Sequence, residues 1–382
     1  MNRKIYLDNA STTPVDQKVM EAMKPFFEEK FGNPSSLHSF GQEARVAIDQ
    51  SREKIADFLN CDPKEIIFTG SATEANNIMI KGLVEADDDP HVITTAIEHD
   101  AVLETVKESG ADYTVLEVDK DGFVSLEELK EAINEKTVLV TVMYANNEIG
   151  TIQPIKEIAE LIKEENKNRD KKIHLHTDAA QAAGYLNCDV DDLGVDGLTI
   201  SGHKIYGPKG IGVLFKKRNV NVSPIIFGGG QEDGIRSGTY NTPLIVGMGK
   251  AVELLGEGKK KEETEELRDY LIEQVLKIKG ASLNGPKKNR LSNNANFSFE
   301  GVEGESIVMI LDQKGIATST GSACSSKSLK ASHVLRAIGL KDLDAHSSLR
   351  VSVGRKTTKS QVDEFLKALP ATIKRLREIS GR

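Results

Sequence analysis

The strongest constraint on the fold is an alternation of short apolar runs with amphipathic stretches, which extends from about Gln17 to Gly247. The short runs are rich in β-branched residues and predict strands at 65–69, 91–95, 113–118, 138–143, 172–175, 198–201 and 211–215. The apolar spacing between them predicts helices at 74–83, 100–108, 125–133 and 154–165. Strands that alternate with helices in this way indicate an α/β fold with a mostly parallel sheet and helices on both faces.

The pattern changes to an α+β type near residue 256. A long helical stretch from 244 to 278 is interrupted there by Gly256. It is followed by predicted strands at 296–299, 316–318 and 349–353, and by predicted helices at 306–313, 331–338 and 360–379. We therefore expect a large domain over 1–255 and a smaller C-terminal domain over 256–382, with the N-terminal segment 1–16 in contact with the small domain.

Composition excludes several classes of protein. The chain of 382 residues has no apolar run as long as the roughly 18 residues that a membrane span requires. Its first residues lack the apolar core of a signal peptide, so we expect a cytoplasmic protein. A net charge of −8 disfavours non-specific binding of nucleic acid. The three cysteines, Cys61, Cys188 and Cys324, form no close pairs, which argues against disulfides and against a structural zinc site.

Two polar clusters at strand ends indicate a chemistry. Lys204 follows the predicted strand 198–201, and Asp178 follows the predicted strand 172–175. Either residue alone is more typical of a solvated lysine or of a turn aspartate. Together they supply an amine that can form a Schiff base and a carboxylate that can hold a pyridinium nitrogen, which are the groups that pyridoxal phosphate (PLP) chemistry requires. Open α/β sheets bind their ligands at these strand ends.

Other polar groups follow strands in the same way. The turn Gly70–Thr73 opens a helix and suits a phosphate, and Ser201 and His203 offer further donors beside it. His99 is either a residue that stacks on a cofactor or acts as an acid or base, or a helix-start hydrogen-bonding residue. Asn147 is suited to a carboxylate or a ring oxygen. Arg350 is either a bidentate clamp for a substrate carboxylate or one half of a structural salt bridge.

Cys324 differs from the other two cysteines in its surroundings. It lies in a loop of small polar residues, 319–328, whereas Cys61 ends a helix and Cys188 lies in a turn-rich stretch. A thiol in such a loop is accessible, as a nucleophile must be. We therefore expect Cys324 to react and the other two to be structural or incidental.

Eight motifs in order along the chain carry a resemblance to a known family. They are Tyr6-Leu7-Asp8-Asn9-Ala10, Ala72-Thr73-Glu74-Ala75-Asn76-Asn77, Glu98-His99, Ala145-Asn146-Asn147-Glu148, His176-Thr177-Asp178-Ala179-Ala180-Gln181, Ser201-Gly202-His203-Lys204, Arg236-Ser237-Gly238-Thr239 and Gly321-Ser322-Ala323-Cys324. Together they resemble the cysteine desulfurases, the NifS/IscS-like group of the class V, fold-type I PLP-dependent enzymes. The resemblance covers nearly the whole chain.

The resemblance implies a role for each matching residue. Lys204 would hold PLP covalently, Asp178 would pair with the pyridine nitrogen, Gln181 with the ring hydroxyl, and His99 would stack on the ring and take part in catalysis. The phosphate would be bound by Ala72, Thr73, Ser201 and His203, and Gly202 would belong to the same cofactor-binding turn. Thr239 would reach the phosphate of a neighbouring subunit, which implies a homodimer. Asn147, beside the cofactor, and Arg350 would hold the substrate carboxylate.

The implied reaction converts L-cysteine to L-alanine and leaves a persulfide on Cys324. The sulfur would pass to an iron–sulfur scaffold protein or another acceptor, for cluster assembly or tRNA thiolation. Cys324 would be the one transient iron–sulfur ligand, and no other metal site is expected. A selenocysteine lyase and a class V aminotransferase share the cofactor site and remain alternatives. A catalytically idle regulatory partner with the same fold is the alternative outside enzymes.

Overall fold

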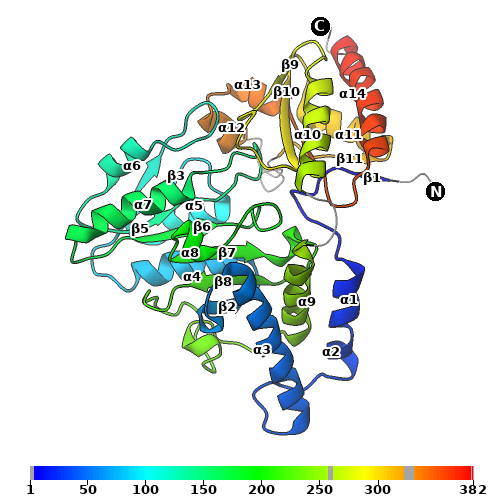
Figure 1. The fold of residues 1–382 in the computed structure, drawn as a ribbon. Coiled ribbons are helices and arrows are strands. Elements are labelled where there is room, and N and C mark those ends of the chain that lie inside the picture. Colours follow the sequence, from blue (N-terminus) through cyan, green and yellow to red (C-terminus); the bar gives the residue numbers. More distant parts are fainter. Residues whose placement is uncertain (1–3, 257–260, 322–330, 380, 382) are drawn as a thin grey trace.

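A seven-stranded sheet forms the centre of the larger part of the molecule. The computed structural model describes residues 4–256, 261–321, 331–379 and 381 (Figure 1). The strands of this sheet are β2 (Ile66–Thr69), β3 (His91–Thr95), β4 (Asp112–Leu116), β5 (Thr137–Thr141), β6 (His174–Asp178), β7 (Gly197–Ser201) and β8 (Gly212–Lys216). Their order is β2-β8-β7-β6-β5-β3-β4, and only β8 runs antiparallel to its neighbours. The predicted mostly parallel sheet is confirmed.

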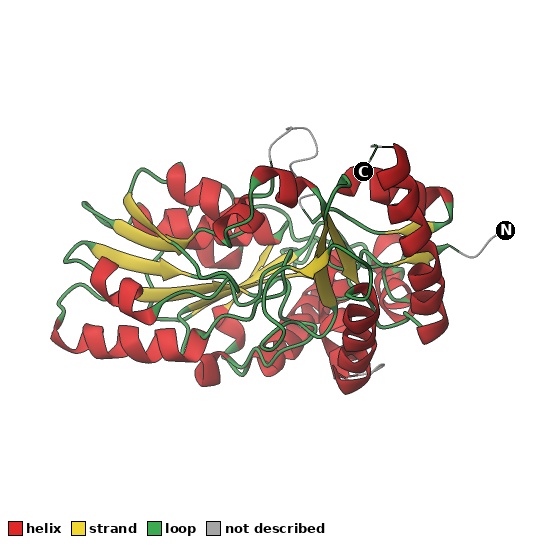
Figure 2. Cartoon of the chain, turned by 90° about the horizontal axis from the view of Figure 1, so that it is seen from above, coloured by secondary structure: helices red, strands yellow, loops and turns green. Residues whose placement is uncertain are grey.

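Helices cover both faces of this sheet (Figure 2). They are α1 (Gln17–Met23), α2 (Pro25–Glu28), α3 (Ser39–Leu59), α4 (Ala72–Val84), α5 (Asp100–Lys107), α6 (Leu126–Ala132), α7 (Ile155–Glu165), α8 (Val190–Leu193) and α9 (Thr242–Glu253). On one face, α4 and α5 pack on strand residues such as Ile67 and Val92. On the other face, α3, α7 and α9 pack on residues such as Phe68 and Ile93. Adjacent strand residues thus alternate between two cores, as the pleat of a strand requires.

One strand begins two residues later in the structure than the sequence predicted. The prediction at 172–175 corresponds to β6 at His174–Asp178, so Asp178 is the last strand residue and does not follow the strand. The polar residues of β6 are buried because they have partners. The ring of His176 contacts Thr141 Oγ1 at 2.8 Å and Thr199 Oγ1 at 3.1 Å. Burial lowers the pKa of His176 to about 4, so it lies in the sheet as a neutral side chain.

The C-terminal part of the chain has its own sheet and core. The antiparallel strands β9 (Ala281–Leu283), β10 (Asn294–Phe299) and β12 (Ser348–Ser352) have the order β12-β10-β9. The helices here are α10 (Lys261–Val275), α11 (Gly304–Gln313), α12 (His333–Ala337), α13 (Asp342–His346) and α14 (Lys359–Ile379). Phe297, Phe299 and Phe365 lie at the centre of this core. The predicted α+β pattern is therefore present.

The N-terminal segment packs against this C-terminal part. Strand β1 (Ile5–Tyr6) pairs in parallel with β11 (Ile316–Ala317), and Ile5 and Leu7 belong to the C-terminal core. Asn9 Nδ2 donates to Ser352 O at 3.0 Å, and Ala10 N donates to Ser352 Oγ at 2.9 Å. The segment then enters the larger part at α1, so it joins the two cores across the edge of the large sheet. Over the described ranges, no helix combines the length and the apolar character that crossing a membrane requires.

Candidate active site

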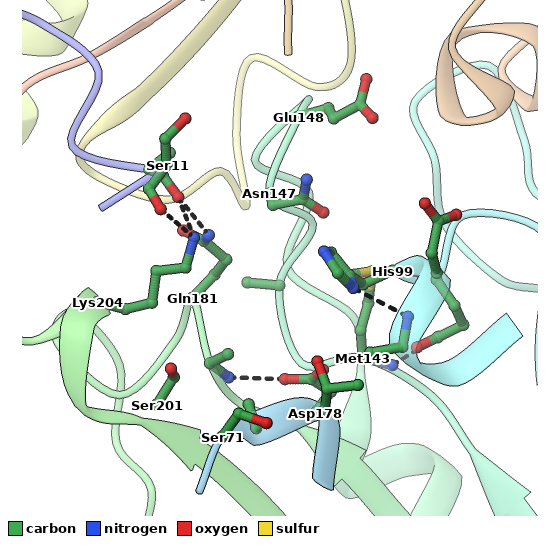
Figure 3. Close-up of a pocket in the computed structure, with 18 of the residues that line it drawn as sticks. Ser11, Ser71, His99, Met143, Asn147, Glu148, Asp178, Gln181, Ser201 and Lys204 are labelled. Atoms are coloured by element: carbon green, nitrogen blue, oxygen red, sulfur yellow. Dashed lines mark hydrogen bonds between the residues drawn. The ribbon is translucent and has the colours of Figure 1, made fainter. Parts of the chain in front are cut away.

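The polar side chains at the strand ends surround a single cavity of about 690 Å³ (Figure 3). Its lining includes Ala72, Thr73, His99, Asn147, Asp178, Gln181, Ser201, His203, Lys204 and Arg350. The C-terminal ends of parallel strands meet at one edge of a sheet, which brings together all of these residues except Arg350, which lies on β12. Of the predicted residues that the structure describes, Gly202 and Thr239 lie outside the lining. Cys324 lies outside the described residues.

Lys204 reaches into the cavity from the end of β7. It closes a short 3-10 turn, η3 (Gly202–Lys204), in which a Cβ on Gly202 would lie 2.7 Å from Ile211 Cγ2. The amine Nζ donates to Ala10 O at 2.6 Å and to Ser11 O at 2.8 Å. Gln181 Nε2 donates to Ala10 O at 2.9 Å. Lys204 and Gln181 therefore point toward the same stretch of the N-terminal segment (Figure 3).

Asp178 is fixed by two donors at the floor of the cavity. Its Oδ1 accepts from Ala180 N at 2.9 Å, and its Oδ2 accepts from Asn76 Nδ2 at 2.8 Å. Asn76 is fully buried on α4, and its Oδ1 has no partner within the described part of the chain. The sequence motif contained Asn76 but suggested no role for it. The sequence feature that pointed to Asn76 was its position as a polar residue on the apolar face of a predicted helix.

His99 has the helix-start role that the sequence offered as one alternative, and its ring also lines the cavity. It is the N-cap of α5, and its Nδ1 accepts from Ala101 N at 3.0 Å, while its ring lines the cavity. An acceptor at Nδ1 places the proton of the neutral ring on Nε2. His99 therefore has a fixed ring orientation and a fixed tautomer.

The start of α4 forms a site suited to an anion. The N-cap Ser71 accepts from Glu74 N at 3.1 Å, and Ala72 and Thr73 open the helix at the cavity. Backbone N–H groups and the positive end of the helix dipole favour a negative group there. Gly212 of β8 packs so closely that a Cβ would lie 2.5 Å from the carbonyl carbon of Ser71. Glycine is therefore required where the strand passes beneath this helix start.

Ser201 and His203 complete the lining near this helix start. Burial, with smaller contributions from Lys204 and Lys209, lowers the pKa of His203 to about 4. Its Nδ1 contacts Thr12 Oγ1 at 3.1 Å. His203 is therefore neutral near pH 7 and contributes a hydrogen bond without a charge.

Arg350 of β12 also lines the cavity and has only 2% of its surface exposed. Its Nη2 donates to Asp8 Oδ1 at 2.9 Å and to Ser11 Oγ at 2.7 Å. Its Nη1 donates to Asn147 O at 2.9 Å and to Gly321 O at 3.3 Å. The salt bridge that the sequence offered as one alternative is present, with Asp8 as the partner. Asn147 binds this guanidinium through its backbone carbonyl.

Two buried carboxyl groups in the cavity wall were not assigned from the sequence. Burial raises the pKa of Glu98 to about 8, and its Oε1 accepts from Thr95 Oγ1 at 2.9 Å and from Met143 N at 2.7 Å. Burial also raises the pKa of Glu148, whose Oε2 accepts from Ser332 Oγ at 2.6 Å. His333 Nε2 contacts Glu98 O at 2.9 Å. The start of α12 is therefore bound to this wall.

Thr239 lines a second cavity of about 230 Å³ that shares Gly210 and Ile211 with the first. Its side chain is exposed. The preceding residues are anchored by Glu232, whose carboxylate accepts from Arg52 Nη2 at 2.8 Å in a mostly buried ion pair. Thr239 therefore lies at the surface, outside the main cavity of its own chain.

The two cysteines that the structure describes are not activated. Cys188 is buried with 1% of its surface exposed, and burial raises its pKa to about 12. Burial, with a smaller contribution from the charge of the nearby Glu65, raises the pKa of Cys61 to about 12 as well. Both thiols are protonated near neutral pH, which makes them poor nucleophiles.

Comparison with known proteins gives a consistent result along the whole chain. The model of the aminotransferase class-V family matches residues 5–365. The "Cysteine desulfurase IscS" of Dictyoglomus turgidum is 50% identical over 100% of this chain and 97% of its own length. The "Cysteine desulfurase IscS 1" of Archaeoglobus fulgidus is 48% identical over 98% of each chain. Among solved structures, a "NIFS-LIKE PROTEIN" has a TM-score of 0.90 and 37% identity, covering 98% of this chain and 100% of its own. One titled "SspA in complex with cysteine" has a TM-score of 0.82 and 40% identity, covering 93% of this chain and 100% of its own.

Proposed function

The chain belongs to the cysteine desulfurases of the aminotransferase class-V family, and we propose that it converts L-cysteine to L-alanine and transfers the sulfur to Cys324 as a persulfide. The observation that carries this proposal is the placement of Lys204, Asp178 and Arg350 around one cavity. An amine, a fixed carboxylate and a buried guanidinium are what an amino-acid substrate and its cofactor require.

The cavity fits pyridoxal phosphate. It presents an amine at Lys204, a carboxylate oriented by two hydrogen bonds at Asp178, and a helix start at Ala72 and Thr73 that suits the phosphate. Lys204 would hold the cofactor covalently, and the other roles would follow the family pattern, with Gln181 at the ring hydroxyl, His99 at the ring face, Ser201 and His203 at the phosphate, and Gly202 in the same cofactor-binding turn. When bound, this cofactor supplies an electron sink for the bonds at the substrate's Cα.

The substrate carboxylate would be bound by Arg350 and Asn147. Burial of the guanidinium strengthens its interaction with a carboxylate, because little water competes for its N–H groups. The solved relative titled as a complex with cysteine supports a substrate of this size and charge.

The protein's own groups would then act in sequence. Lys204 Nζ takes the proton from the substrate's Cα. The thiolate of Cys324 attacks the substrate sulfur, a sulfur–sulfur bond forms, and the bond between sulfur and Cβ breaks. Cβ gains a proton, Lys204 returns a proton to Cα, and alanine leaves, while the transferred sulfur stays on Cys324 as a persulfide. An iron–sulfur scaffold protein or another acceptor would take up this sulfur.

Chain connectivity supports Cys324 as the acceptor. Gly321 and Ala331, on either side of the undescribed residues, both line the cavity. Cys324 is three positions after Gly321, so the chain can hold their Cα atoms no more than about 11 Å apart. Cys61 and Cys188 belong to the main core of the sheet, and their thiols are protonated.

The test is a pulse of L-cysteine on Cys324→Ser, followed by mass spectrometry and sulfide assay. The variant should bind PLP and cysteine, yet form no persulfide and release little sulfide, because a hydroxyl is a far poorer nucleophile toward sulfur. Cys61→Ser and Cys188→Ser are the controls and should keep most activity. In the same pulse on wild type, a sulfur-sized mass increment on Cys61 or Cys188, with Cys324 unmodified, would overturn the assignment.

We also propose that the active unit is a homodimer in which Thr239 reaches the neighbouring subunit's cofactor phosphate. Its exposed position, outside the main cavity of its own chain, supports this role. Sedimentation at assay concentration should give a dimer, and a fully active monomer would contradict the proposal.

The division into a large domain, 1–255, and a small domain, 256–382, remains our proposal. Two features support it. The C-terminal core is separate from the cores of the large sheet, and the N-terminal segment contributes Ile5 and Leu7 to that C-terminal core.

A further inference from the structure

The guanidinium of Arg350 is almost fully hydrogen bonded by the protein itself. Nη1 donates to Asn147 O and Gly321 O, and Nη2 donates to Asp8 Oδ1 and Ser11 Oγ. Each terminal nitrogen carries two N–H groups, so all four are used. Nε is buried and lacks a partner among the residues that the structure describes.

A bidentate carboxylate needs two N–H groups on one edge of the guanidinium. Nε–H shares an edge with one N–H of Nη2, and the other terminal edge is formed by Nη1 and Nη2. Both edges therefore require an N–H of Nη2, which now donates to Asp8 and Ser11. A bidentate substrate carboxylate must displace one of these two partners.

The hydroxyl of Ser11 is the partner that exchanges more easily. Asp8 forms an ion pair with Arg350, and a charged acceptor is held more strongly than a neutral hydroxyl. The Ser11 hydroxyl also donates to Asp8 Oδ1 at 2.8 Å. When a substrate carboxylate replaces it at Arg350, the Ser11 hydroxyl keeps its hydrogen bond to Asp8. Its O–H group is therefore not left without an acceptor.

The backbone around Ser11 is fixed independently of its side chain. Ser11 O accepts from Lys204 Nζ at 2.8 Å, and Ala10 N donates to Ser352 Oγ at 2.9 Å. The side chain of Ser11 is partly exposed. Removing the hydroxyl therefore changes one partner of Arg350 and leaves the course of the segment unchanged.

We propose that the Ser11 hydroxyl competes with the substrate carboxylate for Nη2 of Arg350 and thereby sets the affinity for substrate. The proposal rests on the function proposed above, in which Arg350 binds that carboxylate. Ser11 acts here as a specificity-determining residue: it weakens binding of every ligand that carries a carboxylate and has no effect on ligands that lack one.

The experiment compares holoenzyme carrying Ser11→Ala with wild type and with Ser11→Thr. Ser11→Ala leaves one N–H of Nη2 without a protein partner, so the KM for L-cysteine should fall about ten-fold or more, the value of one hydrogen bond to a charged group. The kcat should stay within about two-fold. Ser11→Thr keeps the hydroxyl and should keep the wild-type KM. Cysteamine, which lacks the carboxylate, should bind wild type and Ser11→Ala equally in absorbance titrations.

The outcomes separate the inference from the function on which it rests. An unchanged or higher KM for L-cysteine in Ser11→Ala overturns the competition by Ser11. An equal fall for cysteine and cysteamine also overturns it, because the effect would not depend on the carboxylate. If Arg350→Gln leaves the KM for L-cysteine unchanged, the carboxylate role of Arg350 itself is wrong, and the proposal for Ser11 is wrong with it.

Discussion

The two ends of the cavity are constructed from different kinds of sequence. The Lys204 end consists of groups at the ends of strands of one sheet, and Asp178 is bound by Ala180 just after β6 and by Asn76 on α4. The Arg350 end combines segments that are far apart, since Arg350 and Asp8 are separated by 342 residues. Local strand-end patterns therefore identify the residues of the first end, which also contacts the N-terminal segment at Ala10 and Ser11, whereas the second end needs that segment for its ion pair.

The difference also concerns charge. Lys204 donates to two backbone carbonyls, while Arg350 is buried and ion-paired with Asp8. Loss of Lys204 should therefore affect chemistry with little effect on folding. Loss of Arg350 should affect both, because it connects β12 to the N-terminal segment. Three predictions test this comparison.

The largest effect is expected for Lys204→Ala. Turnover should fall by at least about 10³-fold, because the proton acceptor and the covalent attachment of the cofactor are both lost. Release of alanine and sulfide measures the change. Lys209→Ala is the matched control, since Lys209 is exposed and near the same turn, and it should keep near wild-type activity. Borohydride reduction and peptide mapping should place the cofactor on Lys204, and label on another lysine would contradict the prediction.

A smaller loss of activity is expected for Arg350→Gln, accompanied by a loss of stability. The kcat/KM for L-cysteine should fall on the order of 10²-fold, mainly through KM. The free energy of unfolding should fall by about 1–3 kcal/mol, because Asp8 loses its charged partner. Urea titrations of this variant and of Lys204→Ala, both without cofactor, give the comparison. Equal stability of the two variants would show that the two ends do not differ in this way.

The smallest effect on turnover is expected for Glu98→Gln, which should change the pH dependence of stability. Burial raises the folded-state pKa of Glu98 to about 8, above its unfolded value of 4.5. Between pH 4.5 and pH 8 the carboxyl of Glu98 is protonated in the folded state and ionised in the unfolded state. The free energy of unfolding therefore falls as pH rises through this window, and outside the window Glu98 adds no pH dependence. Glu98→Gln does not titrate, so its free energy of unfolding lacks this dependence on pH.

Urea midpoints at pH 6 and pH 9 measure this effect. Relative to wild type, Glu98→Gln should gain more than about 1 kcal/mol between the two pH values, the equivalent of one pKa unit. Thr95→Val is the control, because it removes a hydrogen bond to the same carboxyl without removing its titration. Parallel profiles for wild type and Glu98→Gln would show that Glu98 is ionised throughout.

The sequence predicted the Lys204 end well because its determinants are local. Strand β3 at His91–Thr95 was predicted without error, and His99 followed from its position after that strand. The prediction for β6 ended too early because the polar run His176-Thr177 is typical of a loop. The burial of His176 is explained only by its hydrogen bonds to neighbouring strands. Arg350 was singled out at the start of a predicted strand, but its contacts with Asp8 and Ser11 depend on long-range packing, which no local pattern encodes.

The attachment of the N-terminal segment has a consequence during synthesis. Asn9 and Ser352 form a hydrogen bond although 343 residues separate them. At about 5–20 residues per second, a ribosome needs roughly 20–70 s to produce that interval. Before Ser352 is made the large sheet and Lys204 can already be complete, while Ile5 and Leu7 still have no complete core to enter. A nascent chain can therefore acquire a site for the cofactor well before it acquires a site for the substrate.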